Sequence, residues 1–185
     1  GAKSIQGFVD SFLAVSNTYR TKLQIPSILN HFDHFVSHCP NPRMVRKAVQ
    51  KLSSVEHINF KEVFQTKFEP ATELCADIGN TYTSTWGIGL LSLFCNSSVE
   101  VGQNICVFSY GSGSCSSMFS FSVQKPLNVQ HVPAWLDSRT LISPDTFDAI
   151  SSTRPKCHTS PFTPSESLLP GYHLSHVFSD GVRVY

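Results

Sequence analysis

The chain has 185 residues, a formal net charge of +1, 41% hydrophobic residues and 15% charged residues. Such a composition provides material for a sizeable apolar core. It provides no basic surface that would attract nucleic acid, and no apolar stretch reaches the ~18 residues that span a bilayer. Nucleic-acid-binding proteins and integral membrane proteins are therefore not expected, and the length is that of one domain covering residues 1–185.

The first third of the chain predicts a helix, a strand and a second helix in that order. Residues 4–23 place apolar side chains on one helical face. Residues 32–37 are short and rich in aromatic or β-branched side chains, which is typical of a buried strand. Asn41 and Pro42 then supply a cap and a first helical residue for a helix over residues 43–52.

The middle of the chain predicts two further helices and a hairpin. Residues 60–75 have a helical pattern with a break near Pro70, and residues 77–80 form a turn. Residues 83–95 predict a buried helix whose two glycines, Gly87 and Gly89, indicate close packing against another backbone.

Two apolar or alternating runs follow, over residues 104–110 and 116–123. The connection between them, residues 111–115, is short enough for a β-hairpin. Because helices and strands are mixed along the chain, we expect an α/β layered fold.

The C-terminal part carries weaker signals. The pattern fades over residues 125–140, and residues 144–150 predict a short helix. Residues 151–170 are rich in Ser, Thr and Pro and are expected to form a loop. Residues 172–178 and 182–185 predict a final hairpin, because an Asp-Gly dipeptide between them has the preferred two-residue turn chemistry.

The six cysteines follow no metal-binding spacing. None forms a Cys-x-x-Cys pair, and most lie in apolar runs, where a free thiol packs as a small hydrophobic group. We therefore expect free thiols in a reducing compartment, with a disulfide framework as the alternative, and no metal site. The positions are Cys39, Cys75, Cys95, Cys106, Cys115 and Cys157.

Two polar residues stand where open α/β sheets collect ligands. His38 follows the strand predicted over residues 32–37, and ligands of such sheets bind beyond the carboxyl ends of the strands. Asn80 lies in a Gly-Asn turn ahead of the predicted helix over residues 83–95, where its amide can orient a carbonyl oxygen. The alternatives are a structural histidine and an asparagine that only shapes the turn.

The predicted hairpin turn contains Gly111, Ser112 and Gly113. Two glycines let a ligand approach the backbone and let amide groups converge on one point, which suits an oxyanion. A plain tight hairpin is the alternative. The stretch is neither a GxSxG nucleophile elbow nor a P-loop, because glycines flank Ser112 directly and no Gly-Lys-Ser/Thr follows.

Arg43, Arg46 and Lys47 form a basic cluster in the first turns of the helix that follows His38. Such a cluster near a helix start can hold a phosphate. A solvated helix face is the alternative for these residues.

Six short stretches of the sequence, which include the candidate residues above, match a known family in the same order along the chain. They are Ser4-Ile5-Gln6, His38-Cys39-Pro40 with Met44-Val45-Arg46-Lys47, Gly79-Asn80-Thr81-Tyr82-Thr83, Val107-Phe108-Ser109-Tyr110-Gly111-Ser112-Gly113, Leu136-Asp137-Ser138-Arg139-Thr140 and Pro144-Asp145-Thr146-Phe147. Through them the chain resembles the 3-hydroxy-3-methylglutaryl-CoA (HMG-CoA) synthase family, specifically its C-terminal half.

The resemblance implies a thiolase-like fold, in which two similar α/β halves stack as five layers and usually assemble as a homodimer. It implies an acyltransferase that condenses acetyl-CoA with acetoacetyl-CoA to give HMG-CoA, in the mevalonate route to isoprenoids and sterols or in ketogenesis. Both acyl-CoA molecules are substrates, and no cofactor is expected. The location implied is the cytoplasm, with the mitochondrion as the alternative.

In this family the N-terminal half carries the cysteine that receives the acetyl group and the glutamate that acts as acid and base. The family's Ala-Cys-Tyr-Gly-Gly type of motif does not occur here, and the chain starts without a methionine. We therefore expect a fragment that lacks the N-terminal half and needs it as a partner. Cys39 stands where the family usually has serine and is no substitute nucleophile. An isolated half would expose an apolar face and self-associate.

By resemblance, His38 matches the catalytic histidine, which contacts the acetoacetyl group and helps polarise its carbonyl. Asn80 matches an asparagine that hydrogen-bonds the acyl chain, and Tyr82 belongs to the same substrate-binding stretch. Arg43 and Lys47 match basic positions that face the phosphates of coenzyme A.

The Gly111–Gly113 turn also has a role implied by the resemblance. The backbone amide of Ser112, between Gly111 and Gly113, matches a donor of the oxyanion site. Two other functions stay open from the sequence. One is a non-catalytic fragment that binds acyl-CoA or mediates dimerisation. The other is an HMG synthase of polyketide β-branching that acts on carrier-protein-bound acyl groups.

Overall fold

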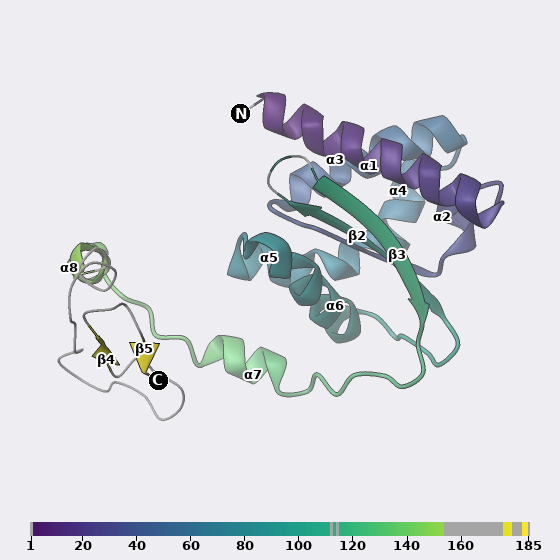
Figure 1. Cartoon of the computed structure of the whole chain (residues 1–185). Coiled ribbons are helices and arrows are strands. Elements are labelled where there is room, and N and C mark those ends of the chain that lie inside the picture. Colours follow the sequence, from purple (N-terminus) through teal and green to yellow (C-terminus); the bar gives the residue numbers. More distant parts are fainter. Residues whose placement is uncertain (1, 112, 114, 154–175, 179–182, 185) are drawn as a thin grey trace. The chain divides into compact units, whose positions relative to one another are not determined.

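The computed structural model describes residues 2–111, 113, 115–153, 176–178 and 183–184 (Figure 1). The chain forms two compact units, Gly1–Trp135 and Leu136–Tyr185. The first unit contains a three-stranded sheet with helices on both faces, which agrees with the α/β layered fold expected from the sequence. Among the described residues, no helix has both the length and the apolar character needed to cross a bilayer.

The sheet has the strand order β1-β2-β3 and is mixed. Strand β1 (His34–Ser37) runs parallel to β2 (Asn104–Gly111), and β2 pairs antiparallel with β3 (Cys115–Ser122). The strand and the hairpin that the sequence predicts are therefore confirmed. Because β1 and β2 are parallel, the chain between them must cross over the sheet, and it does so through the helices that follow β1.

Helices α1 (Ala2–Leu23) and α3 (Pro42–Glu56) cover one face of the sheet, with the short α2 (Ile28–His31) beside them (Figure 1). The sequence predicts α1 and α3, and α3 continues one turn beyond its predicted end. Asn41 caps α3 as expected, because its side chain accepts a 2.8 Å hydrogen bond from the backbone amide of Arg43.

Aromatic side chains fill the layer between these helices and the sheet. Phe8 and Phe12 of α1 meet the ring of Phe108 edge-on, with centroid distances of 5.5 and 5.0 Å. On β1, the ring of Phe35 stacks on Phe68 at 4.4 Å. All five side chains are buried, so this layer is the larger part of the core and fixes the position of α1 over β2.

The segment between α3 and α6 is irregular. Helix α4 (Phe60–Val63) runs into a π-helix over Phe64–Phe68 and a 3-10 turn over Glu69–Ala71, and α5 (Glu73–Ile78) follows. The break predicted at Pro70 is confirmed. The turn predicted over residues 77–80 starts later than expected, because α5 continues to Ile78.

The opposite face of the sheet is covered by α6 (Thr85–Asn96), which a 3-10 turn over Tyr82–Ser84 precedes. A Cβ atom on Gly89 would lie 3.0 Å from Val36 Cγ1 and 3.1 Å from the Ala71 carbonyl oxygen, so the close packing predicted for Gly89 is confirmed. For Gly87 the prediction is wrong within the described part of the chain, because no atom outside its own helix backbone and chain neighbours lies within 4 Å of the position that its Cβ would take.

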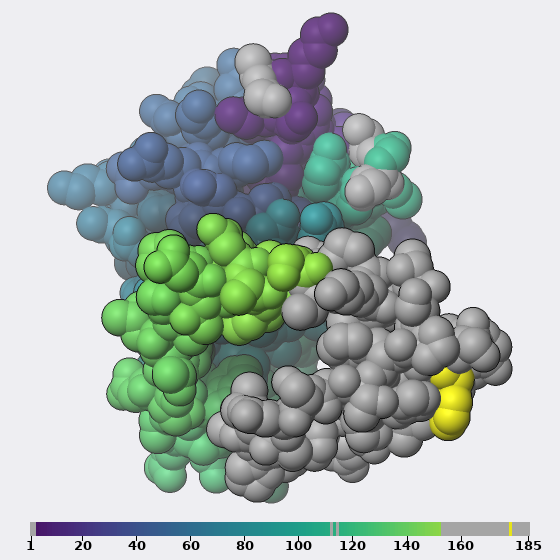
Figure 2. Space-filling model, turned by 90° about the vertical axis from the view of Figure 1, so that its left-hand side faces the viewer, coloured from purple at the N-terminus to yellow at the C-terminus, as the bar shows by residue number. Residues whose placement is uncertain are grey.

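The second unit contains the short elements of the C-terminal part. Helix α7 (Val132–Asp137), at the boundary of the units, is absent from the sequence prediction, whereas α8 (Pro144–Thr153) confirms the predicted helix and extends it. Strands β4 (His176–Val177) and β5 (Arg183–Val184) pair antiparallel, as the predicted final hairpin requires. The Asp-Gly turn and most of the predicted loop lie outside the described residues. Figure 2 shows the surface of α8 in light green. The Phe147 side chain of this helix is 60% exposed.

Candidate functional site

A pocket of about 540 Å³ lies at the carboxyl end of β1. Its lining contains five of the six residues that the sequence assigns to catalysis and substrate binding: His38, Asn80, Tyr82, Gly111 and Gly113. The sixth, Ser112, lies outside the described residues. The volume is in the range of small-molecule sites. Residues far apart in the sequence therefore converge on one cavity of suitable size.

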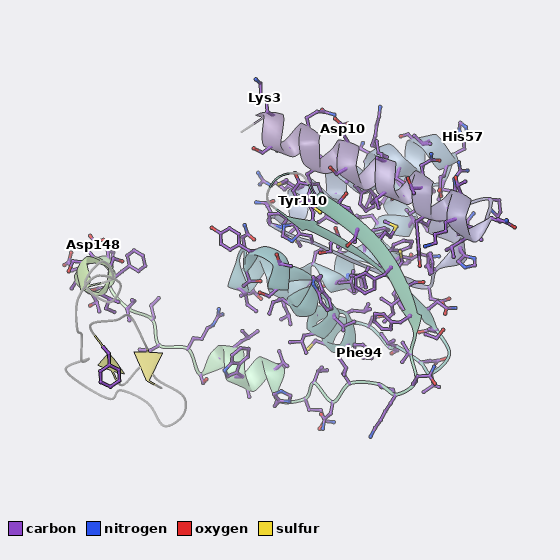
Figure 3. All side chains as sticks on the ribbon, viewed as in Figure 1. Lys3, Asp10, His57, Phe94, Tyr110 and Asp148 are labelled. Carbon is purple, nitrogen blue, oxygen red and sulfur yellow. The ribbon has the colours of Figure 1, made fainter. Side chains whose placement is uncertain are left out.

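Seven other residues also line the pocket: Lys3, Ser4, Gly7, Pro40, Met44, Thr83 and Tyr110. Lys3 at the start of α1 and Tyr110 on β2, both labelled in Figure 3, belong to this wall, as does Met44 of α3. Met44 and Tyr110 stand in the stretches that carry the family resemblance but have no expected role in the site, and Lys3 stands in none of them. Tyr110 directly precedes the glycine turn, so its place in the hairpin is the one signal by which it could have been found.

His38 is held by the sheet and is 5% exposed. Its backbone amide donates a 2.7 Å hydrogen bond to the Phe108 carbonyl, which extends the β1–β2 pairing by one residue. The ring lies beside Tyr110, at a centroid distance of 6.0 Å, and its Nδ1 atom is buried without a hydrogen-bond partner among the described residues. An imidazole nitrogen that lacks a protein partner is available to a ligand.

Burial lowers the pKa of the His38 ring from its usual value of 6.5, and the backbone of Tyr82 offsets part of this shift. The ring is therefore neutral at pH 7. A neutral imidazole can donate one hydrogen bond and accept another, so His38 can polarise a carbonyl oxygen without bringing a full charge into the pocket.

Asn80 is fixed by the turn that ends α5. Gly79 adopts φ +86° and its amide donates a 2.9 Å hydrogen bond to the Cys75 carbonyl. The Oδ1 atom of Asn80 then accepts a 2.8 Å hydrogen bond from the backbone amide of Tyr82. With the oxygen engaged in this way, the side-chain NH₂ group is the part of Asn80 that remains to donate to a ligand.

Tyr82 has a strained backbone and an exposed side chain. Its φ of +53° is left-handed, which costs a non-glycine residue about 1–2 kcal/mol. The hydroxyl of Thr85 donates a hydrogen bond to the Tyr82 carbonyl and helps to hold this conformation. Since the side chain is 75% exposed, Tyr82 reaches the pocket from its rim.

The glycine turn presents bare backbone to the pocket. Gly111 pairs with Cys115 at the end of the hairpin, and Gly113 adopts φ +81°. Apart from its chain neighbours, no described residue has an atom within 4 Å of the position that a Cβ would take on either glycine. A ligand can therefore approach the main chain at both residues.

Arg43 and Lys47 line a second pocket of about 320 Å³, together with Ile5, Asn41 and Met44. Met44 belongs to both pockets, so the two cavities adjoin. The structure separates Arg46 from this group: its guanidinium lies 5.2 Å from the ring centres of Phe60 and Phe64. Arg46 forms cation–π contacts and does not line this pocket, so the pocket contains two of the three residues of the predicted basic cluster.

Cys39 lies beside the catalytic candidate but is a buried structural thiol. Its hydrogen bond with Cys75 and its burial raise its pKa well above the usual value, so the thiol stays protonated. A protonated thiol is a poor nucleophile. The five cysteines among the described residues are free, and Cys157 lies outside them.

The sequence of the chain is similar to that of known proteins. The family model for the C-terminal part of hydroxymethylglutaryl-coenzyme A synthase matches residues 55–183. The chain belongs to the HMG-CoA synthase family. Its sequence is 36% identical to HMG-CoA synthase A of Dictyostelium discoideum over 137 residues, which are 68% of this chain and 28% of that protein.

Solved HMG synthases have the same fold. A curacin-pathway HMG synthase in complex with apo donor-ACP superimposes with a TM-score of 0.88 at 21% identity, over 100% of this chain and 50% of that one. An HMG-CoA synthase complexed with CoA superimposes with a TM-score of 0.84 at 23% identity, over 100% and 48%. The thiolase-like fold expected for this HMG-CoA synthase chain is therefore confirmed. The chain spans less than half the length of the curated relatives it matches.

Proposed function

We propose that this chain is the C-terminal half of an HMG-CoA synthase that condenses acetyl-CoA with acetoacetyl-CoA to give HMG-CoA for the mevalonate route. The observation that carries the proposal is the convergence of His38, Asn80 and the glycine turn on one pocket. Neutral donors from separate elements surround a space in which a carbonyl oxygen can develop negative charge. Such preorganised donors are the usual means of stabilising an oxyanion.

The pocket supports one assignment of the reaction steps to the two halves of the fold. The N-terminal half supplies the acetylated cysteine and the glutamate that moves protons. In this chain, the neutral ring of His38 and the NH₂ group of Asn80 donate to the acetoacetyl ketone oxygen as it is attacked. Backbone amides at the Gly111–Gly113 turn donate hydrogen bonds to the thioester oxygen. Water then releases the product from the cysteine.

The adjoining basic pocket fits the phosphates of coenzyme A. Arg43 and Lys47 are one helical turn apart, and both line a pocket of about 320 Å³ at the surface. The pantetheine arm would pass Met44, which lines both cavities. A solved protein of the same fold is a complex with CoA, which supports this choice of ligand.

The missing half of the fold is the partner that α6 requires. This helix is apolar around its circumference, and such helices are normally buried on all sides. One side packs on the sheet, while Leu91 and Phe94 on α6 stay half-exposed, as does Trp86 at its start. We propose that the N-terminal half covers this face, that the complete protein is a homodimer, and that it works in the cytoplasm. Sedimentation of the isolated chain would then reveal self-association, and a monodisperse monomer would contradict the proposal.

The decisive experiment uses the complete enzyme with His38→Ala. Transfer of radiolabelled acetyl to the cysteine should survive, because that step belongs to the other half. Turnover with acetoacetyl-CoA should fall about 10²–10³-fold, the usual effect of removing an oxyanion donor. Loss of acetylation with unchanged acetoacetyl-CoA use would overturn the role of His38.

The coenzyme A pocket has a matched pair of variants. Arg43→Gln should raise KM for both CoA thioesters, and the increase should shrink at high salt because the lost contact is ionic. Arg46→Gln is the control, because the Arg46 guanidinium lies over Phe60 and Phe64 rather than in the pocket. Equal effects of the two variants would remove Arg43 from the binding site.

A carrier-protein-bound substrate is the second candidate. It is favoured by one observation: a solved HMG synthase that superimposes with a TM-score of 0.88 is a complex with a donor-ACP. Acetylation by acetyl-CoA and by an acetylated carrier protein should be compared at equal concentrations. A preference for the free CoA thioester supports the main proposal, whereas activity with the carrier protein alone assigns the enzyme to β-branching.

A further inference from the structure

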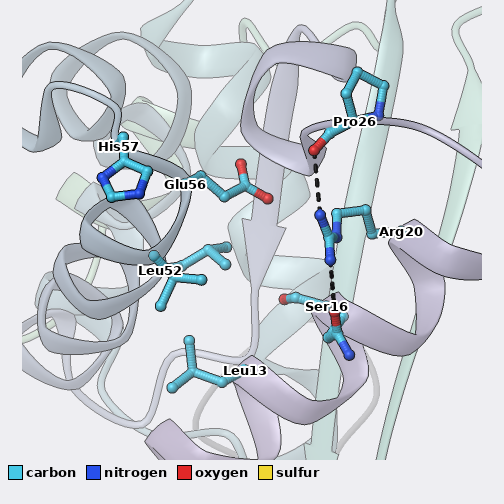
Figure 4. Close-up of a pocket in the computed structure, with 9 residues that line it drawn as sticks. Leu13, Ser16, Arg20, Pro26, Leu52, Glu56 and His57 are labelled. Carbon is cyan, nitrogen blue, oxygen red and sulfur yellow. Dashed lines mark hydrogen bonds between the residues drawn. The ribbon is translucent and has the colours of Figure 1, made fainter.

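A third cavity, of about 400 Å³, lies between the C-terminal parts of α1 and α3 (Figure 4). It shares no lining residue with the acyl pocket or with the basic pocket. Leu13, Pro26, Leu52 and Val55 supply apolar wall, whereas the remaining lining residues are polar. The cavity is therefore a separate site of small-molecule size with a mixed surface.

Two hydrogen-bond donors face this cavity without a full complement of acceptors. The hydroxyl of Ser16 is completely buried and has no hydrogen-bond partner among the described residues. Arg20 donates to the Pro26 carbonyl at 3.3 Å and to Asn17 Oδ1 at 2.9 Å, which leaves part of its five N–H groups unused. Within the described part of the chain, no hydrogen bond or ion pair joins Arg20 to a carboxylate.

The acceptor in the cavity wall is already occupied. Glu56 accepts a 3.0 Å hydrogen bond from the Ile28 amide, a 3.1 Å bond from the Leu29 amide and a 2.7 Å bond from the Ser27 hydroxyl. These donors stabilise its negative charge at the start of α2. The cavity thus has apolar walls and two opposite charges that differ in what they can still bind: Arg20 has unused N–H groups, whereas the Glu56 carboxylate already accepts from three donors.

We infer that this cavity binds a small organic acid, whose carboxylate receives hydrogen bonds from Arg20 and Ser16. The ligand's short apolar body would lie on Leu13 and Leu52. An alcohol cannot neutralise the guanidinium, and an amine would add a second positive charge beside it.

The test is a calorimetric titration of the full chain with hexanoate, and with hexan-1-ol as the uncharged match. Hexanoate should bind at least about tenfold more tightly than hexan-1-ol, because a charge-assisted pair is lost with the alcohol. Arg20→Gln should abolish this difference, and Ser16→Ala should weaken hexanoate binding about threefold. His38→Ala, in the other pocket, should leave hexanoate affinity unchanged, which separates this inference from the proposed function.

Three outcomes would overturn the inference. Equal affinity for hexanoate and hexan-1-ol would mean that the cavity is only an apolar crevice. Unchanged hexanoate binding in Ser16→Ala and Arg20→Gln would place the acid elsewhere, and loss of binding in His38→Ala would place it in the acyl pocket. If Arg20→Gln lowers the melting temperature too far for titration, Ser16→Ala decides, since it removes one buried oxygen without removing a hydrogen bond between described residues.

Discussion

The side-chain oxygen of Asn80 accepts a 2.8 Å hydrogen bond from the backbone amide of Tyr82. The same residue, Tyr82, also interacts through its backbone with the ring of His38, where it opposes the effect of burial on the pKa. One strained, left-handed residue therefore connects the two polar groups of the acyl pocket. Their relative position depends on the 3-10 turn before α6 rather than on direct contact between them.

This relationship separates two functions of the Asn80 side chain. Asn80→Asp keeps the oxygen that accepts from Tyr82 but replaces the donor NH₂ by a second acceptor. We expect the melting temperature to stay within about 2 °C of the parent, whereas kcat/KM of the complete enzyme for acetoacetyl-CoA falls about 10²-fold. Asn80→Ala removes both functions and should lower stability as well. Full activity in Asn80→Asp would show that the amide donates nothing to the substrate.

His38 should make stability depend on pH. Its pKa is lowered in the folded chain, chiefly by burial, so between that value and about 6.5 the unfolded chain binds more protons than the folded one. The free energy of unfolding therefore rises with pH across this window. The contribution of His38 to it is lost progressively as the pH falls below about 6.5. Urea titrations from pH 5 to pH 7.5 should show a shallower rise in His38→Gln. His57→Gln, a change at an exposed ring, is the control.

The hairpin glycines should differ in their tolerance of a side chain. Gly113→Ala forces alanine into φ +81° and should lower the free energy of unfolding by about 1–2 kcal/mol. Gly111 has no positive φ, and open space surrounds the position of its Cβ, so Gly111→Ala should change stability by less than about 0.5 kcal/mol. Urea denaturation of both variants measures the difference. Equal losses would mean that the turn is not held in its left-handed conformation.

Local sequence signals predict the elements of the first unit well. The Asn41-Pro42 start of α3 and the β2–β3 hairpin depend on neighbouring residues only, so both could be predicted. The π-helix over Phe64–Phe68 and the left-handed conformation of Tyr82 depend on tertiary packing, so no local sequence pattern predicts them. Helix α7 could not be predicted either, because a helix of six residues is too short to show a periodic pattern.

The candidate site was predictable as a set of residues but not as a shape. His38, Asn80 and the glycine turn were each ambiguous from the residues alone, and the family resemblance grouped them. Their convergence depends on the parallel pairing of β1 with β2, which brings His38 next to Phe108. Arg46 shows the opposite case. Its spacing on α3 groups it with Arg43, but its guanidinium contacts two aromatic rings on a later segment.

The last prediction concerns how closely α6 approaches the sheet. Gly89→Ala would place a Cβ 3.0 Å from Val36 Cγ1 and 3.1 Å from the Ala71 carbonyl oxygen. The carbonyl belongs to the main chain and cannot rotate away, so α6 must shift, and we expect a loss of about 1–3 kcal/mol. Gly87→Ala meets open space in the same helix and should gain about 0.5–1 kcal/mol through helix propensity. Opposite signs in chemical denaturation of the two variants would establish Gly89 as the point of closest approach, whereas stabilisation by both would show that α6 packs more loosely on β1.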